Sequence, residues 1–167
     1  MDEGLYKAAE RLVGILQKHG KTISTAESCT GGLISAAITA IPGASNIFSL
    51  GVCTYSAEQK INILGVSPEV IKKYTVVSSE TVLQMAGGIK KLALSDYAIS
   101  VSGIAGPGGG TAGNPVGTVW FGFAAGEKIL SEKRHFKGNR DEVRKQAVLF
   151  AIEKIIEIIN GEKYDTP

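Results

Sequence analysis

The feature that most constrains the fold is a near-continuous apolar run at residues 96–102, which opens directly into a glycine-rich loop. Runs of this kind are typical of strands covered on both faces, because the alternation with polar residues is lost where neither face meets solvent. We therefore expect this segment to be a central strand of a sheet. Its cover has to come from helices on both faces, which predicts an α/β fold.

The rest of the chain alternates between helical and extended patterns. Apolar residues at helical spacing, with capping and stop residues at the ends, predict helices at 5–19, 33–40, 57–64, 78–94 and 141–159, and a short helix that starts near 67–69. Extended patterns predict strands at 22–26 and 50–55, and an antiparallel hairpin formed by 117–125 and 129–136. This order predicts one domain over residues 1–167, a three-layer α/β/α sandwich with a mixed, mostly parallel sheet and an antiparallel hairpin near the C-terminus, followed by a frayed tail at 161–167.

Charge and cysteine content exclude several classes of protein. Lys and Arg number 18 against 16 Asp and Glu, so the net charge of +2 provides no general attraction for nucleic acid or an anionic membrane. Two cysteines, Cys29 and Cys53, and two histidines are too few for a disulfide framework or a zinc site. The first residues lack the basic region and apolar segment of a signal peptide, and no apolar run approaches the roughly 20 residues that span a bilayer. We expect a cytoplasmic protein without a metal or cofactor.

Three loops that follow predicted strands are candidate ligand sites, because ligands of open α/β sheets collect where strand ends meet helix starts. The first loop, 26–32, contains Ser28, Cys29 and Thr30 ahead of Gly31 and Gly32. It leads into a helix N-terminus whose free N–H groups suit a phosphate. The simpler interpretation of this loop alone is a capping turn with Ser28 as the N-cap.

The second loop, 102–110, is the glycine-rich segment after the central strand. Glycines cost conformational entropy on folding, so their concentration here favours a place where backbone approaches a ligand closely. The loop is neither a Walker A sequence nor a dinucleotide fingerprint, because no Gly-Lys-Ser/Thr follows and no helix opens after it. The alternative is a flexible entry to the hairpin.

The third segment could supply a nucleophile. Tyr55 ends a predicted strand and Lys60 lies just over one turn into a helix, so both could converge on a hydroxyl such as that of Ser45. A desolvated lysine has a lowered pKa and can take a serine proton without a histidine. Taken individually, Lys60 is more often a solvated helix lysine, Tyr55 a half-buried strand aromatic and Ser45 a turn residue, so the pattern alone favours these structural roles.

Two arginines four residues apart, Arg140 and Arg144, occupy the start of the last helix and could both fork onto a phosphate. The alternative is local pairing with Asp141 and Glu142 in a solvated first turn. Cys29 is a conceivable nucleophile, but no histidine partner is evident for it.

Five segments, in order along the chain, resemble the C-terminal domain of CinA, the competence/damage-inducible protein, and its relatives the nicotinamide-nucleotide amidohydrolases. They are Thr25 to Gly32, Thr54-Tyr55-Ser56 with Lys60, Ser102 to Pro107, Pro115 to Val119, and Arg140-Asp141-x-Val143-Arg144. The resemblance implies hydrolysis of nicotinamide mononucleotide to nicotinate mononucleotide and ammonia, without metal or cofactor, within NAD salvage.

The same resemblance implies roles for individual residues. Ser45 would be the nucleophile, with Ser49 as the alternative, Lys60 the general base and Tyr55 a relaying or stabilising hydroxyl. Substrate contacts would come from Glu27, Ser28, Thr30, Gly31, Gly32, Ser102, Gly103 and Gly106, with Arg140 or Arg144 on the 5′-phosphate.

The main rival function is a non-catalytic nucleotide- or protein-binding module in competence or the DNA-damage response, which would not need Lys60 beside a pocket. For the enzyme we expect a small-molecule partner, nicotinamide mononucleotide, and neither nucleic acid nor membrane. A homo-oligomer is expected, with a dimer favoured because C2 dimers are the commonest assemblies.

Overall fold

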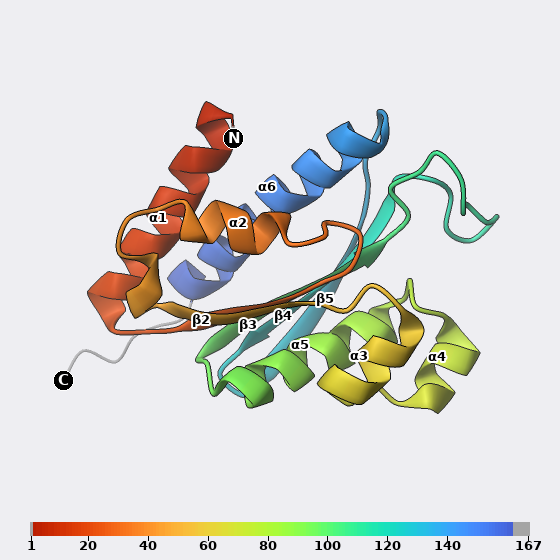
Figure 1. Cartoon of the computed structure of the whole chain (residues 1–167), viewed down its shortest axis with the longest axis horizontal. Helices are drawn as coiled ribbons and strands as arrows, with labels where there is room; N and C mark the ends of the chain where they lie inside the picture. The colour runs from red at the N-terminus through yellow and green to blue at the C-terminus, as the bar shows by residue number, and fades with distance from the viewer. Residues whose placement is uncertain (1, 162–167) are drawn as a thin grey trace.

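A five-stranded sheet separates two layers of helices in the computed structural model, which describes residues 2–161 (Figure 1). The strands lie in the order β2-β1-β3-β4-β5. Their bounds are β1 Ile23–Glu27, β2 Phe48–Cys53, β3 Tyr97–Gly103, β4 Thr118–Ala125 and β5 Lys128–His135. Helices α1 (Glu3–His19), α2 (Leu33–Thr39) and α6 (Arg140–Gly161) cover one face, and α3 (Ala57–Leu64), α4 (Pro68–Tyr74) and α5 (Ser79–Ala93) the other.

The predicted three-layer sandwich is therefore confirmed, with the apolar run as the central strand β3. The sheet is mixed, as expected. The pairs β1–β2 and β1–β3 are parallel, whereas β3–β4 and β4–β5 are antiparallel, so β4 runs opposite to the other four strands. The two-residue turn after β4 makes the β4–β5 pair the expected hairpin. Of the predicted frayed tail, residues 162–167 lie outside the described part of the chain.

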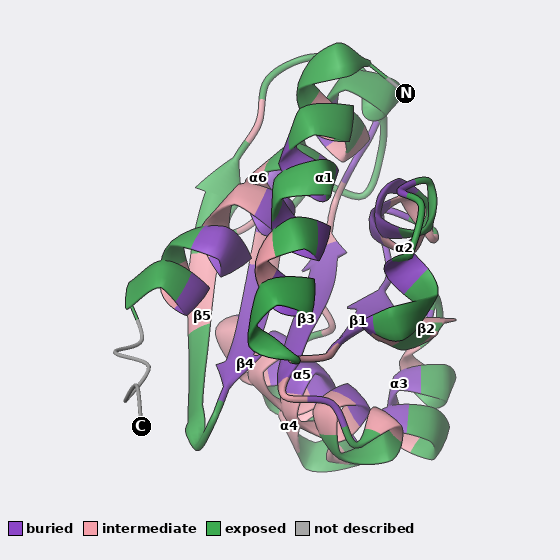
Figure 2. Ribbon diagram, turned by 90° about the vertical axis from the view of Figure 1, so that its left-hand side faces the viewer, coloured by how far each residue is buried: buried purple, intermediate pink, exposed green. Residues whose placement is uncertain are grey.

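Burial follows the position of each strand in the sheet (Figure 2). β3 is buried over nearly its whole length, and its side chains alternate between the two helical layers. Ile99 and Val101 join the core under α1 and α6, and Ala98 joins the core under α5. β5 forms an edge and is largely exposed, with charged side chains that discourage further strand pairing. No helix within residues 2–161 is long and apolar enough to cross a membrane.

The parallel strands β2, β1 and β3 bring their carboxyl ends to one edge of the sheet. The chain leaves β1 toward α2 on one face and leaves β2 toward α3 on the opposite face (Figure 1). Such a divergence opens a crevice beyond the strand ends, where ligands of open α/β sheets bind. The loops after β1, β2 and β3, all singled out from the sequence, meet at this edge.

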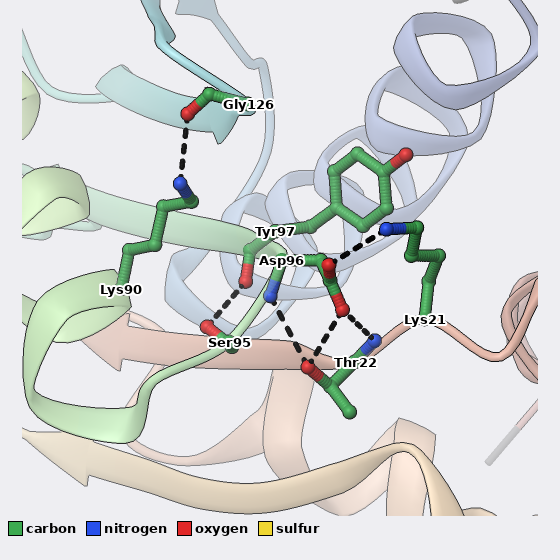
Figure 3. Close-up of polar contacts among 7 residues, drawn as sticks. All are labelled: Lys21, Thr22, Lys90, Ser95, Asp96, Tyr97 and Gly126. Carbon is green, nitrogen blue, oxygen red and sulfur yellow. Dashed lines mark hydrogen bonds and ion pairs between the residues drawn. The ribbon is translucent and has the colours of Figure 1, made fainter. Parts of the chain in front are cut away.

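The opposite ends of β1 and β3 are tied together by Asp96 (Figure 3). Its carboxylate accepts hydrogen bonds from the N–H of Thr22 at 2.9 Å and from its hydroxyl at 3.1 Å, and it pairs with Lys21 at 2.9 Å. The N–H of Asp96 donates in return to the Thr22 hydroxyl at 3.1 Å. These contacts support the register that aligns Glu27 with Val101 at the ligand-binding edge.

Candidate active site

Lys60 is a fully buried lysine at the carboxyl edge of the sheet, with 1% of its surface exposed. Ser56 caps α3 by accepting the N–H of Gln59, and Lys60 and Leu64, four residues apart, form the helix face that turns toward the sheet. The Nζ of Lys60 donates to the carbonyl of Thr54 at 2.6 Å and lies 3.1 Å from the Oγ of Ser28. Burial lowers the pKa of Lys60 to about 8, although the nearby Cys29 opposes the shift.

Ser28 lies between two neighbouring hydroxyl residues at the strand ends. The parallel ladders continue past β1, because Thr54 N–H donates to the Glu27 carbonyl at 2.9 Å and Ser28 N–H to the Val101 carbonyl at 3.0 Å. Thr54, Ser28 and Ser102 are consequently abreast across three strands and share the sheet face that α3 and α5 cover. All three are buried. The Thr54 hydroxyl has no hydrogen-bond partner within residues 2–161.

The structure does not bring Ser45 together with Lys60, contrary to the expected convergence on Ser45. Ser45 is exposed in the short helix η1 (Ala44–Asn46), which precedes β2, whereas Tyr55 and Lys60 follow β2. A strand of six residues separates these positions by about 20 Å, at about 3.3 Å for each residue. The alternative nucleophile, Ser49, is also exposed, near the start of β2. The hydroxyl that meets the buried amine is that of Ser28.

Glu27, expected among the substrate contacts, is instead occupied entirely by its own chain. One carboxylate oxygen accepts the Thr30 hydroxyl at 2.7 Å and the N–H groups of Gly32 and Ile34, each at 3.0 Å. The other accepts the N–H and the hydroxyl of Ser35, at 2.8 and 2.7 Å. The buried carboxylate thus caps α2, and the free helix N-terminus expected to receive a phosphate is already neutralised.

The turn between Ser28 and α2 depends on two glycines with left-handed backbone. Gly31 has φ +61° and Gly32 has φ +94°, which disfavours other residues. A Cβ on Gly31 would also lie 3.3 Å from an Nη atom of Arg144. Arg144 donates to the carbonyl of Cys29 at 3.1 Å and to that of Thr30 at 3.0 Å. Two groups expected to face substrate, the Thr30 hydroxyl of this turn and the Arg144 guanidinium of the last helix, are therefore engaged within the protein.

A cavity of about 420 Å³ lies between the glycine-rich loop and the connection from α4 to α5. Gly103 and Gly106, both expected to contact substrate, line it together with Arg140. Arg140 donates to the Gly106 carbonyl at 2.9 Å and to the hydroxyl of Tyr55 at 3.0 Å. Both Arg140 and Tyr55 are exposed, so the guanidinium is accessible from the cavity.

Ser102 connects the row of hydroxyls to this cavity. Its Oγ donates to the carbonyl of Val76, which also lines the cavity, at 2.7 Å. Thr75, one residue earlier, has φ +70°, an uncommon conformation for a β-branched residue. The cavity wall facing the glycine-rich loop is thereby fixed by a hydrogen bond from the central strand.

Cys29 adjoins Ser28 but is unsuited to be the nucleophile. Burial raises the pKa of its thiol to about 12, so the reactive thiolate is scarce near neutral pH.

Three contributions to the site were not evident from the sequence: Ser28 as the partner of Lys60, the Thr54 carbonyl as its anchor, and Ser35 as a partner of Glu27. For Ser28 a signal existed. Both Ser28 and Lys60 follow strands predicted to be parallel, whereas Ser45 precedes its strand.

The sequence model of the CinA C-terminal domain matches residues 5–159. The nicotinamide-nucleotide amidohydrolase PncC of Escherichia coli (strain K12) is 45% identical over 156 residues, which cover 92% of this chain and 94% of that protein. The CinA-like protein of Petrotoga mobilis is 49% identical over 148 residues, covering 89% of this chain but 37% of its own length. The chain thus spans little more than a third of the length of its longer relatives.

Solved structures give the same assignment. The CinA superfamily protein of Klebsiella pneumoniae superposes with a TM-score of 0.92 at 37% identity, covering 95% of this chain and 99% of that one. The competence/damage-inducible protein CihA of Agrobacterium tumefaciens superposes with a TM-score of 0.92 at 38% identity, covering 96% and 98%. The fold, the match over residues 5–159 and these similarities together show that the chain belongs to the CinA C-terminal domain family.

Proposed function

We propose that this chain hydrolyses the carboxamide of nicotinamide mononucleotide, releasing ammonia and nicotinate mononucleotide. The observation that carries the proposal is the 3.1 Å contact between the buried amine of Lys60 and the hydroxyl of Ser28. Relatives that align over more than nine-tenths of both chains are named nicotinamide-nucleotide amidohydrolase, which supports the substrate. A module that only binds a nucleotide or a protein has no use for a desolvated lysine against a serine.

Ser28 is the nucleophile of this mechanism and Lys60 is its general base. Once Lys60 has lost its proton, its lone pair faces the Ser28 hydroxyl over the same 3.1 Å, while the Thr54 carbonyl still accepts one of its N–H groups. The Ser28 Oγ attacks the carboxamide carbon as its proton moves to Lys60. Because the pKa of Lys60 is lowered to about 8, about a tenth of the molecules hold the neutral amine at pH 7.

The tetrahedral intermediate then collapses. The lysine ammonium returns the proton to the departing nitrogen, the C–N bond breaks, and ammonia leaves an ester between nicotinate and Ser28. A water molecule, deprotonated by the same Lys60, attacks this ester and releases the carboxylic acid and the free Ser28 hydroxyl. One base thus serves both half-reactions.

The cavity of about 420 Å³ receives the rest of the nucleotide in this proposal. Its size lies in the range of small-molecule sites, and four of its twelve lining residues are glycines, which allow close approach of a ribose phosphate. Arg140 is the accessible cation on this wall, and its planar fork suits the 5′-phosphate. Gly103 lines this cavity, and Ser102, the residue before it, is the neighbour of Ser28 on the adjacent strand.

Ammonia release from nicotinamide mononucleotide by the purified protein, with a chelator present, tests the proposal. Ser28→Ala and Lys60→Met are each expected to reduce kcat by at least about 10³-fold, since each removes one half of the nucleophile system. Ser45→Ala is the matched control, because it removes an equivalent hydroxyl from the far end of β2, and it is expected to retain activity. Loss of turnover in Ser45→Ala with retention in Ser28→Ala would refute the proposed nucleophile.

A further inference from the structure

Arg144 contacts the turn that carries the proposed nucleophile, and it does so only through backbone. Its Nε donates to the Cys29 carbonyl at 3.1 Å and one Nη to the Thr30 carbonyl at 3.0 Å. The remaining Nη lies 3.8 Å from Asp141, an exposed partner. Two of the three nitrogens of the guanidinium therefore hold the two residues that follow Ser28.

The other side of this turn is held by the opposite charge. The Glu27 carboxylate accepts the Thr30 hydroxyl and the Gly32 N–H, at 2.7 and 3.0 Å. The carbonyl of Ser28 accepts the Gly31 N–H at 3.0 Å. Each carbonyl of Ser28, Cys29 and Thr30 thus has a donor in the protein, and the conformation of the turn is fixed before any substrate binds.

Two backbone N–H groups in the turn, those of Cys29 and Thr30, have no acceptor within residues 2–161. Thr30 is fully buried. Buried N–H groups without a partner in the protein are rare, so the Thr30 N–H is available to an acceptor that the protein does not supply. This N–H belongs to the same peptide as the Cys29 carbonyl, and in a trans peptide the N–H points opposite to the C=O. By holding that carbonyl, Arg144 directs the Thr30 N–H away from itself.

Arg144 belongs to α6, on one face of the sheet, while Lys60 belongs to α3 on the other (Figure 1). An N–H that points away from α6 faces the side on which the Ser28 Oγ meets Lys60. There it can donate to the oxyanion that forms when the Ser28 Oγ bonds to the carboxamide carbon.

We infer that Arg144 is a positioning residue for the nucleophile turn and the Thr30 N–H, and not a ligand of the substrate phosphate. This inference rests on the proposed amidohydrolase function. It assigns different roles to the two arginines of α6, because Arg140 lines the cavity and Arg144 contacts the turn. Replacing Arg144 then reduces stabilisation of the transition state, which lowers kcat, whereas replacing Arg140 weakens substrate binding, which raises KM.

Steady-state kinetics with nicotinamide mononucleotide on Arg144→Lys test this division. Lysine keeps the charge that a phosphate requires, but it lacks the planar fork that reaches two carbonyls at once. We expect kcat to fall about 10²-fold with KM within about threefold of the parent, and added guanidinium to restore part of kcat in Arg144→Ala. Lys145→Met, which removes the neighbouring exposed charge of α6, is expected to keep both constants within about twofold.

The outcomes separate the inference from the function on which it rests. A parent protein that releases no ammonia would refute the amidohydrolase. An active parent in which Arg144→Lys keeps its kcat, or in which Arg144→Ala raises KM alone, would overturn the positioning role and restore the phosphate ligand. If urea titrations show that Arg144→Ala is already unfolded without denaturant, the kcat of Arg144→Lys decides between the two roles. A retained kcat overturns the positioning role, and a reduced kcat supports it.

Discussion

The Nζ of Lys60 lies 3.1 Å from the Oγ of Ser28, although 32 residues separate them in the chain. The parallel pairing of β1 with β2 places the ends of the two strands side by side, and Ser56 starts α3 so that its first turn directs Lys60 back over the sheet. The resulting dyad needs no histidine, since burial itself lowers the pKa of the amine to about 8.

The rate of hydrolysis is expected to rise with pH. Only the neutral amine can accept the Ser28 proton, and the pKa of Lys60 is about 8, so kcat/KM should increase tenfold per unit below pH 8 and level off above it. Initial rates between pH 6 and 10 on nicotinamide mononucleotide measure this profile. A rate that is constant across the range, in a protein shown to be folded throughout, would mean that Lys60 is not the titrating base.

Replacing Lys60 by methionine is expected to stabilise the fold while abolishing activity. Below pH 8 the lysine is charged in both the folded and the unfolded chain, and burying that charge costs on the order of 3 kcal/mol for a pKa lowered from 10.5 to about 8. Methionine fills a similar volume without the charge. The lost hydrogen bonds to Ser28 and Thr54 reduce the gain, so an increase of about 1 to 2 kcal/mol in unfolding free energy at pH 7 is expected.

The pH dependence of that gain distinguishes its cause. Between pH 8 and 10.5 the unfolded chain binds more protons at Lys60 than the folded one, so the parent becomes more stable relative to Lys60→Met as the pH rises. Urea unfolding of both proteins at pH 7 and pH 10 measures the difference. A gain that does not shrink at pH 10 would assign the effect to packing and not to the buried charge.

Periodicity alone predicted the layers of this fold, but it could not predict which hydroxyl meets Lys60. The helices and strands were recognisable because apolar spacing is a local property, and the amine in α3 was recognisable from its place after a strand. The nucleophile depends on strand order and direction, which no single segment encodes. Ser45 is near Tyr55 and Lys60 in sequence, but β2 carries the chain away from it. Ser28 is distant in sequence and adjacent in space.

Glu27 is a second residue whose contacts could not be predicted from the local sequence. A glutamate at a strand end before Ser28 is consistent with a substrate contact, and only the fold shows that five donors of the next turn and helix α2 already surround it. The sequence predicts a substrate phosphate at the N-terminus of α2. In the structure, the anion at that helix end is the carboxylate of Glu27 itself.

Glu27→Gln is expected to destabilise the protein by about 3 kcal/mol. The amide NH₂ would face N–H and O–H donors that now meet a carboxylate oxygen, which leaves buried donors without an acceptor. Glu58→Gln, an exposed glutamate in the first turn of α3, is the matched control and should change stability by less than about 0.5 kcal/mol. Urea titrations at pH 7 make the comparison, and equal stability of the two variants would contradict the capping role.

The tie between β1 and β3 at Asp96 is expected to weaken in acid (Figure 3). Partial burial raises the pKa of Asp96, but the contacts with Lys21 and Thr22 outweigh it and hold the pKa below its usual value. The charged carboxylate therefore contributes stability above about pH 4, and the contribution is lost as the pH falls through the lowered pKa. Asp96→Asn should cost about 1 kcal/mol at pH 7, since the site is partly exposed, and less at pH 3. A difference in unfolding free energy that is unchanged at pH 3 would exclude this charge as its source.

Arg140 is expected to select for the phosphate of the substrate. Its guanidinium lines the cavity and is held by the Tyr55 hydroxyl and the Gly106 carbonyl, so Arg140→Met removes the accessible cation without touching Ser28 or Lys60. The KM for nicotinamide mononucleotide should rise about tenfold or more, while kcat changes little. Nicotinamide riboside lacks the phosphate, so its inhibition constant should be nearly the same for parent and variant. Tyr55→Phe, which removes only the hydroxyl that holds Arg140, should raise KM by a smaller factor. If Arg140→Met weakens binding of the riboside as much as binding of the mononucleotide, Arg140 does not contact the phosphate. The nucleotide then lies across the cavity in another orientation.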